Sequence, residues 1–476
     1  MRRLVSFIVG SAFVFSSFVV ATPTSGSPIK AGARCDKVGT LAQQGSKAFI
    51  CTKKSGKRLW LASTKLKDGG KCLYRKQWTR TSSGKFTCTK VAKKLVWVFR
   101  ENSTPLPDIS PDSLFREDTY CQLRQTYQNY FLTGFGFPRS EVRLKNTGDV
   151  RGIVLYVEFS DVRGTDDPLA DAATYVPKFE QYYKSNSYGN LNLKMDVYPQ
   201  YLQINRNSGF YKMDTWGGGD PYAYWKDALT VADPYVDFSP YELVVVMPPS
   251  GISKITYGPS FPMPPTSQVG QTAEKTIHNG AVGGADQRNR STRWIWLAHE
   301  VGHVFGMEHQ FTYDSEAVWD LMNNVYFATA PELFGWHRFL QGWMSDTNVK
   351  CLDSGDLATG SRTVLLEPLV TTNSGSKISI VRLDAQRALV VEVRRILGTD
   401  TLDGNNQYEG TIVYVIDVSK QSNEGAISMV IPISQRTSNN RIVGNMREGE
   451  YVEFQGIRVT VLKSTSQGDY ISLSRS

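Results

Sequence analysis

Three of the chain's five histidines stand in one eleven-residue stretch, His299-Glu-Val-Gly-His-Val-Phe-Gly-Met-Glu-His309. His299 and His303 are four residues apart, so a helix places both imidazoles on one face, where they can bind one metal ion. Glu300 adjoins them and can accept a proton from a metal-bound water. Gly306 is expected to end the helix and to bring His309 back as a third ligand. Three nitrogen ligands with an open fourth position are typical of a catalytic zinc.

The chain after this motif offers two further candidate residues. The pattern H-E-x-x-H-x-x-G-x-x-H is that of metzincin zinc peptidases, whereas ordinary helical histidines need neither the glycine nor the third histidine. Met322, in Trp319-Asp-Leu-Met-Asn-Asn, lies thirteen residues after His309 and can form an apolar floor beneath the zinc. A core methionine is the alternative. Tyr326 is a candidate oxyanion donor or displaceable ligand, and a packed tyrosine is the alternative.

The order of several segments resembles the immune inhibitor A family of secreted bacterial zinc metallopeptidases. The similarity covers residues 150–345 and includes the motif. The other similar segments are Val154-Leu-Tyr-Val-Glu-Phe-Ser-Asp-Val, Phe179-Glu-Gln-Tyr-Tyr-Lys-Ser-Asn-Ser-Tyr-Gly-Asn-Leu, Val236-Asp-Phe-Ser, Trp319-Asp-Leu-Met and Gly335-Trp…Leu340-Gln-Gly-Trp. The family commonly has aspartate as its third ligand, where this chain has His309. Because three histidines are fully competent for zinc, the difference concerns the subfamily.

The resemblance implies a secreted zinc endopeptidase that hydrolyses peptide bonds of extracellular proteins. Glu300 would be the general base, His299, His303 and His309 the zinc ligands, and Met322 the floor of the site. The implied partner is a protein or peptide substrate. A hypothesis from another class is a cell-envelope binding or adhesion protein that carries a vestigial metallopeptidase domain.

The hydrophobic pattern predicts an α+β fold for the region that must position the motif. Residues 152–159 and 241–247 are apolar runs suited to buried strands, and residues 172–185 and 222–232 have helical spacing. The motif helix is expected over residues 291–305, capped by Ser291 or Thr292. We therefore expect a metallopeptidase domain over residues 150–349, with a mixed sheet and a zinc-binding helix that follows the last strand.

The rest of the chain, residues 350–476, predicts a C-terminal β-sandwich domain. Seven short runs of alternating apolar residues are separated by turn-rich joints, which is typical of antiparallel sandwiches. No cluster of His, Cys and Asp lies among them, so we expect support or substrate docking there. The runs are 363–366, 378–383, 389–393, 412–418, 427–433, 457–462 and 470–473.

Residues 28–100 form a basic module with an internal repeat. Two pairs of cysteines sixteen residues apart, Cys35 with Cys51 and Cys72 with Cys88, recur at an offset of 37 residues, as do Trp60 and Trp97. Units this small suit a β-rich fold stapled by disulfides. The module has 19 Lys and Arg against two Asp, so an anionic cell-wall polymer is a candidate partner. A merely soluble lysine-rich module is the alternative, and no specific nucleic-acid partner is expected.

The first 27 residues read as a signal peptide and spacer. Arg2 and Arg3 precede an apolar run to Ala21, followed by a turn-rich segment. An uncleaved anchor is the alternative, but cleavage would leave a mature chain without a transmembrane span. We therefore expect a secreted or cell-surface-associated protein with disulfides.

Two more parts of the sequence have open interpretations. Residues 101–149 are a linker or a propeptide-like segment; there Cys121 is expected to pair with Cys351, although free thiols or a zinc-capping Cys121 are alternatives. Asp161, Asp166 and Asp167 suggest calcium as a second metal, with a solvated loop as the alternative. His278 and His337 are expected to be structural.

Overall fold

The computed structural model divides the chain into two compact units, Met1–Leu106 and Pro107–Ser476. The expected signal segment 1–27, His309 and Tyr326 lie outside the described residues. Within the part of the chain that the structure describes, no helix is long and apolar enough to cross a membrane. The described residues are 30–44, 47–62, 67–72, 75–80, 84–101, 105–127, 129, 131–308, 319–323, 330–371, 374–397, 408–421, 424–432, 435 and 444–476.

In the first unit, the 37-residue sequence repeat is also a structural repeat. Each copy forms an antiparallel hairpin, and the two hairpins begin 37 residues apart, at Lys47 and Gly84. Together the strands make a six-stranded sheet in the order β1-β2-β4-β5-β6, with β3 paired to β2. The strands are β1 (Leu41–Gln44), β2 (Lys47–Lys54), β3 (Lys57–Ala62), β4 (Trp78–Arg80), β5 (Gly84–Val91) and β6 (Lys94–Glu101).

Both expected disulfides of this unit are present, Cys35–Cys51 and Cys72–Cys88. The second bond lies beside Trp97, which is fully buried, in a small core. Because this core has few members, the disulfides are the physically expected means of stabilising the repeats.

The second unit contains the expected mixed sheet, which has more strands than the hydrophobic pattern indicated. Its order is β10-β11-β9-β7-β8; all neighbours are parallel except the antiparallel pair β10 and β11. Strand β10 therefore lies at an edge, next to the strand that precedes the motif helix. The strands are β7 (Gly148–Phe159), β8 (Leu191–Ile204), β9 (Leu243–Met247), β10 (Ser260–Pro262) and β11 (Asn279–Val282).

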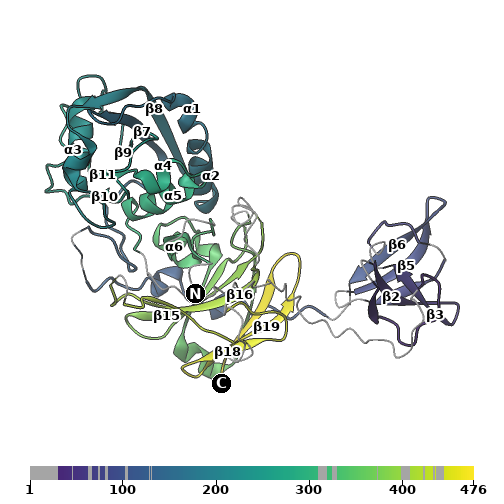
Figure 1. The fold of residues 1–476 in the computed structure, drawn as a ribbon. Helices are drawn as coiled ribbons and strands as arrows, with labels where there is room; N and C mark the ends of the chain where they lie inside the picture. Colours follow the sequence, from purple (N-terminus) through teal and green to yellow (C-terminus); the bar gives the residue numbers. More distant parts are fainter. Residues whose placement is uncertain are drawn as a thin grey trace, which may run out of the picture. The chain divides into compact units, whose positions relative to one another are not determined.

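Helices cover both faces of this sheet (Figure 1). Side chains on β7 alternate between the faces: Val154 packs with α2 and α5, whereas Leu155 packs with α3. Burial on both faces explains why the strand is a continuous apolar run. The helices of the second unit are α1 (Pro168–Ala172), α2 (Val176–Asn186), α3 (Pro221–Ala232), α4 (Ala285–Arg288), α5 (Arg293–Val304) and α6 (Gly335–Leu340).

Two further sheets pack face to face in the C-terminal part, and all seven expected runs contribute strands to them. One sheet has the order β12-β14-β15-β16-β17 and the other β13-β20-β19-β18. The strands are β12 (Val349–Asp353), β13 (Arg362–Leu366), β14 (Ile378–Arg382), β15 (Arg387–Arg394), β16 (Gly410–Asp417), β17 (Ile427–Met429), β18 (Tyr451–Phe454), β19 (Ile457–Ser464) and β20 (Asp469–Arg475).

The pairings among the seven expected runs are all antiparallel, whereas the additional edge strand β12, which the sequence pattern did not indicate, pairs with β14 in parallel. The β14–β15–β16 sheet is also buried on both faces. Its second face packs against α6 and against Trp319, next to the motif region. The boundary expected at residue 349 stays a prediction, because both of its sides belong to one compact unit.

Much of the segment expected as a linker or propeptide packs into the second unit. Cys121 and Phe135 are fully buried against the β12–β14 region, and Leu144 joins the core of the mixed sheet. The disulfide Cys121–Cys351 is present, so neither thiol is free and Cys121 is no zinc cap. The propeptide interpretation stays a prediction.

Candidate metal centre

The motif helix α5 ends as the glycine predicts. Gly306 has a φ of 91°, and its N–H donates to the carbonyl of His303 at 2.8 Å. The N–H of Met307 donates to the carbonyl of Gly302 at 3.0 Å. These two bonds form a Schellman motif, which needs a left-handed residue after the helix. At the other end, Thr292 occupies the N-cap position but makes no side-chain cap bond, contrary to the expectation of a capping side chain.

The structure brings His299 and His303 together on one face of α5. Their ring centroids are 5.0 Å apart, and the ring planes are nearly perpendicular at 86°. The Nδ1 of His299 lies 2.9 Å from the carbonyl oxygen of Leu321, and the Nδ1 of His303 lies 2.9 Å from that of Met307. A carbonyl oxygen only accepts, so each neutral ring carries its proton on Nδ1. Each Nε2 then has the lone pair that a metal requires.

Burial keeps His299 in the neutral form. Its side chain is 3% exposed, and burial, reinforced by the proximity of His303, lowers its pKa to about 3. A neutral imidazole is the form that binds a metal.

Glu300 lies beside the two rings and contacts the edge of the mixed sheet. Its Oε2 accepts a hydrogen bond of 2.9 Å from the backbone N–H of Ser260, the first residue of β10. Burial raises the pKa of Glu300 above its ordinary value, although His303 and the bond from Ser260 act in the opposite direction. A carboxylate with a raised pKa accepts a proton more readily, which suits a general base.

Met322 lies against the motif helix at the point between the two histidines. A β-carbon on Gly302 would overlap its sulfur, so the thioether packs directly on the helix backbone. Met322 is fully buried in the 3₁₀ turn Leu321–Asn323, the same turn whose Leu321 carbonyl holds His299. Met322 therefore packs directly on the motif helix, and its role as an apolar floor beneath a zinc stays a prediction.

Two of the expected site residues, His309 and Tyr326, lie outside the described residues. Their roles as third ligand and oxyanion donor stay predictions. Among the residues that the structure describes, no group of three or more His, Cys, Asp or Glu is arranged to hold a metal ion. Two imidazoles whose tautomers are fixed by backbone carbonyls are suitable ligands for zinc. A third ligand would have to come from outside the described residues.

The acidic cluster uses its oxygens within the protein. Asp161 accepts from the N–H and hydroxyl of Ser208, Asp166 pairs with the buried Arg288, and Asp167 caps α1. The calcium hypothesis stays a prediction without a described ligand group in its support.

The other two histidines have different surroundings. His337 is fully buried, with its Nδ1 3.2 Å from Asp320, which agrees with a structural role. His278 lines a cavity instead, and its Nδ1 has no hydrogen-bond partner among the described residues.

Sequence reasoning missed the groups that hold the site in place. The carbonyls of Leu321 and Met307 and the N–H of Ser260 are backbone groups, which carry no sequence signal. Asp320 is different: its carboxylate accepts from the N–H of Met322 at 3.1 Å and from that of Phe334 at 2.7 Å. An aspartate two residues before a turn residue is a recognisable sign of such a bond.

Comparisons with known proteins give no family for this chain. No family model matches it, and no curated protein matches it. Among solved structures, it is similar to metalloproteinase-II from Bacteroides fragilis, with 12% sequence identity and a TM-score of 0.27. The similarity covers 63% of this chain and 89% of that chain.

Proposed function

We propose that the chain is a secreted zinc-dependent endopeptidase of the immune inhibitor A type. The observation that carries the proposal is the pair His299 and His303, each with its Nδ1 directed to a carbonyl, beside Glu300 and above Met322. His299, His303 and His309 would hold the zinc, which when bound supplies Lewis-acid activation of water and of the scissile carbonyl.

In this proposal, Glu300, Ser260 and Tyr326 each have a distinct role in the reaction. Glu300 accepts the proton of the attacking water and donates it to the leaving amine, aided by its raised pKa. Ser260 holds the carboxylate in place through its N–H. Tyr326 is the proposed donor to the developing oxyanion. The three disulfides support export, because such bonds persist in oxidising compartments.

The decisive variant is Glu300→Gln, which keeps the size of the side chain and removes its basicity. We expect casein cleavage to fall by roughly 10²- to 10⁴-fold, the usual contribution of a general base, while one zinc per chain is retained. Activity is measured with fluorescent casein and zinc by mass spectrometry, with and without a chelator.

Glu117→Gln is the matched control, since Glu117 is exposed and distant in sequence from the motif. Full activity of Glu300→Gln with zinc still bound would contradict the mechanism. Zinc binding without cleavage in the unmodified chain would favour the alternative, an envelope-binding protein with a vestigial peptidase domain.

We further propose that residues 28–100 bind an anionic cell-wall polymer. The module's described Lys53, Lys57 and Arg58 are charged and largely solvent-accessible on the β2–β3 hairpin. Binding of the full chain to purified cell walls should weaken with added salt and be lost when the module is deleted. Unchanged binding after the deletion would refute this proposal.

A further inference from the structure

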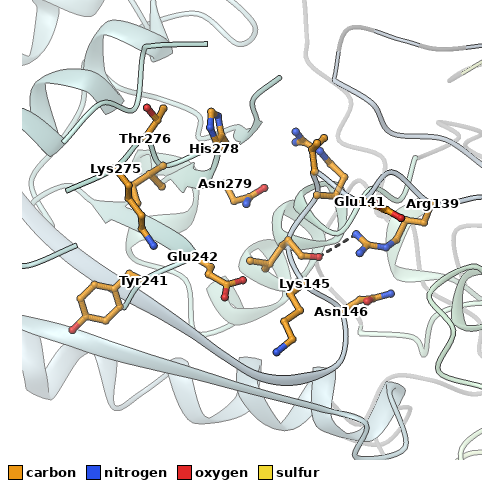
Figure 2. Close-up of a pocket in the computed structure, with 14 residues that line it drawn as sticks. Arg139, Glu141, Lys145, Asn146, Tyr241, Glu242, Lys275, Thr276, His278 and Asn279 are labelled. Atoms are coloured by element: carbon orange, nitrogen blue, oxygen red, sulfur yellow. Dashed lines mark hydrogen bonds between the residues drawn. The ribbon is translucent and has the colours of Figure 1, made fainter. Parts of the chain in front are cut away.

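A cavity of about 390 Å³ lies at the N-terminal ends of strands β7, β9 and β11 (Figure 2). Figure 2 shows that its wall comes from three stretches of chain, 139–146, 241–242 and 275–279. It holds four cationic side chains and two carboxylates. The charged residues are Arg139, Arg143, Lys145, Lys275, Glu141 and Glu242.

Arg143 is the unusual member of this set, because its charge is buried without a counterion. Its side chain is 3% exposed, and one of its terminal nitrogens donates to the carbonyl of Met263. Its Nε and Nη1 have no hydrogen-bond partner, and no carboxylate of the described residues pairs with it. Burial, reinforced by the nearby Arg139, lowers its pKa to about 10. An unpaired buried guanidinium is costly, so its presence calls for an explanation.

Two neighbours in the same cavity each have one polar atom without a partner in the described structure. The Nδ1 of His278 and the Oδ1 of Asn279 are buried and make no hydrogen bond in the described structure. Unsatisfied buried polar atoms are few in folded proteins, and here several line one cavity. An anionic ligand that accepts hydrogen bonds would satisfy the N–H groups of Arg143, and it could accept from His278 when its Nδ1 carries the proton, whereas the Oδ1 of Asn279 is itself an acceptor.

Arg143 connects this cavity to the end of the motif helix. A β-carbon on Gly306 would lie 3.1 Å from the Cγ of Arg143, so the arginine packs against the end of the motif helix. Met263, whose carbonyl accepts from Arg143, follows strand β10. Ser260, whose N–H donates to Glu300, precedes Met263 by three residues. Three residues of extended chain span about 10 Å.

We propose that this cavity binds a carboxylate group through Arg143, and that an acidic residue of the peptide substrate supplies it. A carboxylate matches the guanidinium in charge and in hydrogen-bonding geometry. The peptide source rests on the proposed peptidase function, whereas carboxylate binding itself does not. A free small carboxylate is the other source of the same chemistry.

The test measures binding by calorimetry to the full chain carrying Glu300→Gln, so that peptides stay intact. Succinate is compared with the neutral succinamide, and a peptide with one Glu is compared with the same peptide carrying Gln. We expect each acid to bind roughly tenfold more tightly than its neutral match, and Arg143→Gln to abolish the difference. The control Lys145→Gln removes an exposed cation of the same cavity. This variant should keep most of the difference in affinity between each acid and its neutral match.

Equal affinities for succinate and succinamide would overturn the site, as would a preference that survives Arg143→Gln. A preference for succinate without one for the Glu peptide would overturn the peptide source and support a free carboxylate. If Arg143→Gln fails to fold by circular dichroism, Arg143→Lys, which keeps the charge but not the planar pair of donors, should reduce the preference instead, and an unchanged preference there would count against the site. Because no cleavage is measured, failure of this test leaves the peptidase proposal standing.

Discussion

Asp320 shows how a single residue positions the candidate site without being one of its proposed ligands. The carboxylate is fully buried and accepts one N–H from the Met322 turn and one from Phe334. The same turn supplies the carbonyl that fixes the ring of His299. Asp320 therefore couples the Met322 turn to the orientation of an expected zinc ligand.

Replacing Asp320 should affect both stability and zinc binding. Asp320→Ala leaves two buried N–H groups without an acceptor and removes the carboxylate beside the ring of His337, so it should reduce the free energy of unfolding by about 2 to 5 kcal/mol. Asp320→Asn keeps one acceptor oxygen and should reduce the free energy of unfolding by a smaller amount. Urea unfolding and competitive zinc titration measure the two effects.

Asp237→Ala serves as the control for the Asp320 variants. Asp237 is exposed and bonds only to the nearby Ser239 among the partners described. Its replacement should leave zinc affinity unchanged. Equal zinc affinity in Asp320→Ala and the unmodified chain would show that the aspartate does not position the site.

At the scale of the element, the end of α5 decides where the chain goes after the second histidine. Gly306 provides the left-handed residue of the Schellman motif, and Arg143 packs on it. Helix α6 ends in the same way at Gly342, which has a φ of 66°, but nothing lies within 4 Å of a β-carbon placed there. Substitutions at these two glycines therefore distinguish the effect of backbone strain, which both share, from that of steric crowding, which only Gly306 has.

Alanine at these two positions should give different results. Gly342→Ala should cost about 1 kcal/mol of unfolding free energy, the penalty of a left-handed alanine. Gly306→Ala should cost more, because its β-carbon also displaces Arg143, and it should weaken zinc binding by redirecting the chain toward His309. Thermal unfolding and zinc titration of both variants test this. Identical behaviour of the two variants would exclude a special role of the α5 terminus.

At the scale of the whole molecule, the second unit is held together across long stretches of sequence. Cys121 and Cys351 are 230 residues apart, and their bond joins the segment before the mixed sheet to strand β12. Arg116 adds a bidentate ion pair with Asp356 in the same region. The segment before residue 150 is thereby part of the unit that carries the candidate metal centre.

Removing the long-range disulfide should destabilise this unit as a whole. Replacing both Cys121 and Cys351 by serine should cost about 3 to 5 kcal/mol, because the cross-link restricts a very large loop of the unfolded chain. Hydrogen exchange followed by mass spectrometry measures the rate of amide exchange in each of the two units separately. The control Cys35→Ser with Cys51→Ser should increase exchange in the first unit only. Unaltered exchange in the mixed sheet of the long-range variant would contradict the prediction.

The local features of this protein can be predicted from the amino-acid sequence. The spacing of His299 and His303, the glycine at 306 and the apolar alternation of the C-terminal runs predict the helix, its end and seven strands, because each depends on residues close in the chain. The cysteine spacing likewise predicts the two disulfides of the repeats, and the remaining bond, Cys121–Cys351, joins the two cysteines left over.

Which distant groups come into contact depends on the folded structure and cannot be predicted from the sequence. The carbonyl of Leu321 at His299, the N–H of Ser260 at Glu300 and the parallel pairing of β12 with β14 involve backbone atoms that every residue type provides. The unpaired charge of Arg143 is equally invisible in the sequence, since an arginine shows its lack of a partner only once the chain has folded around it.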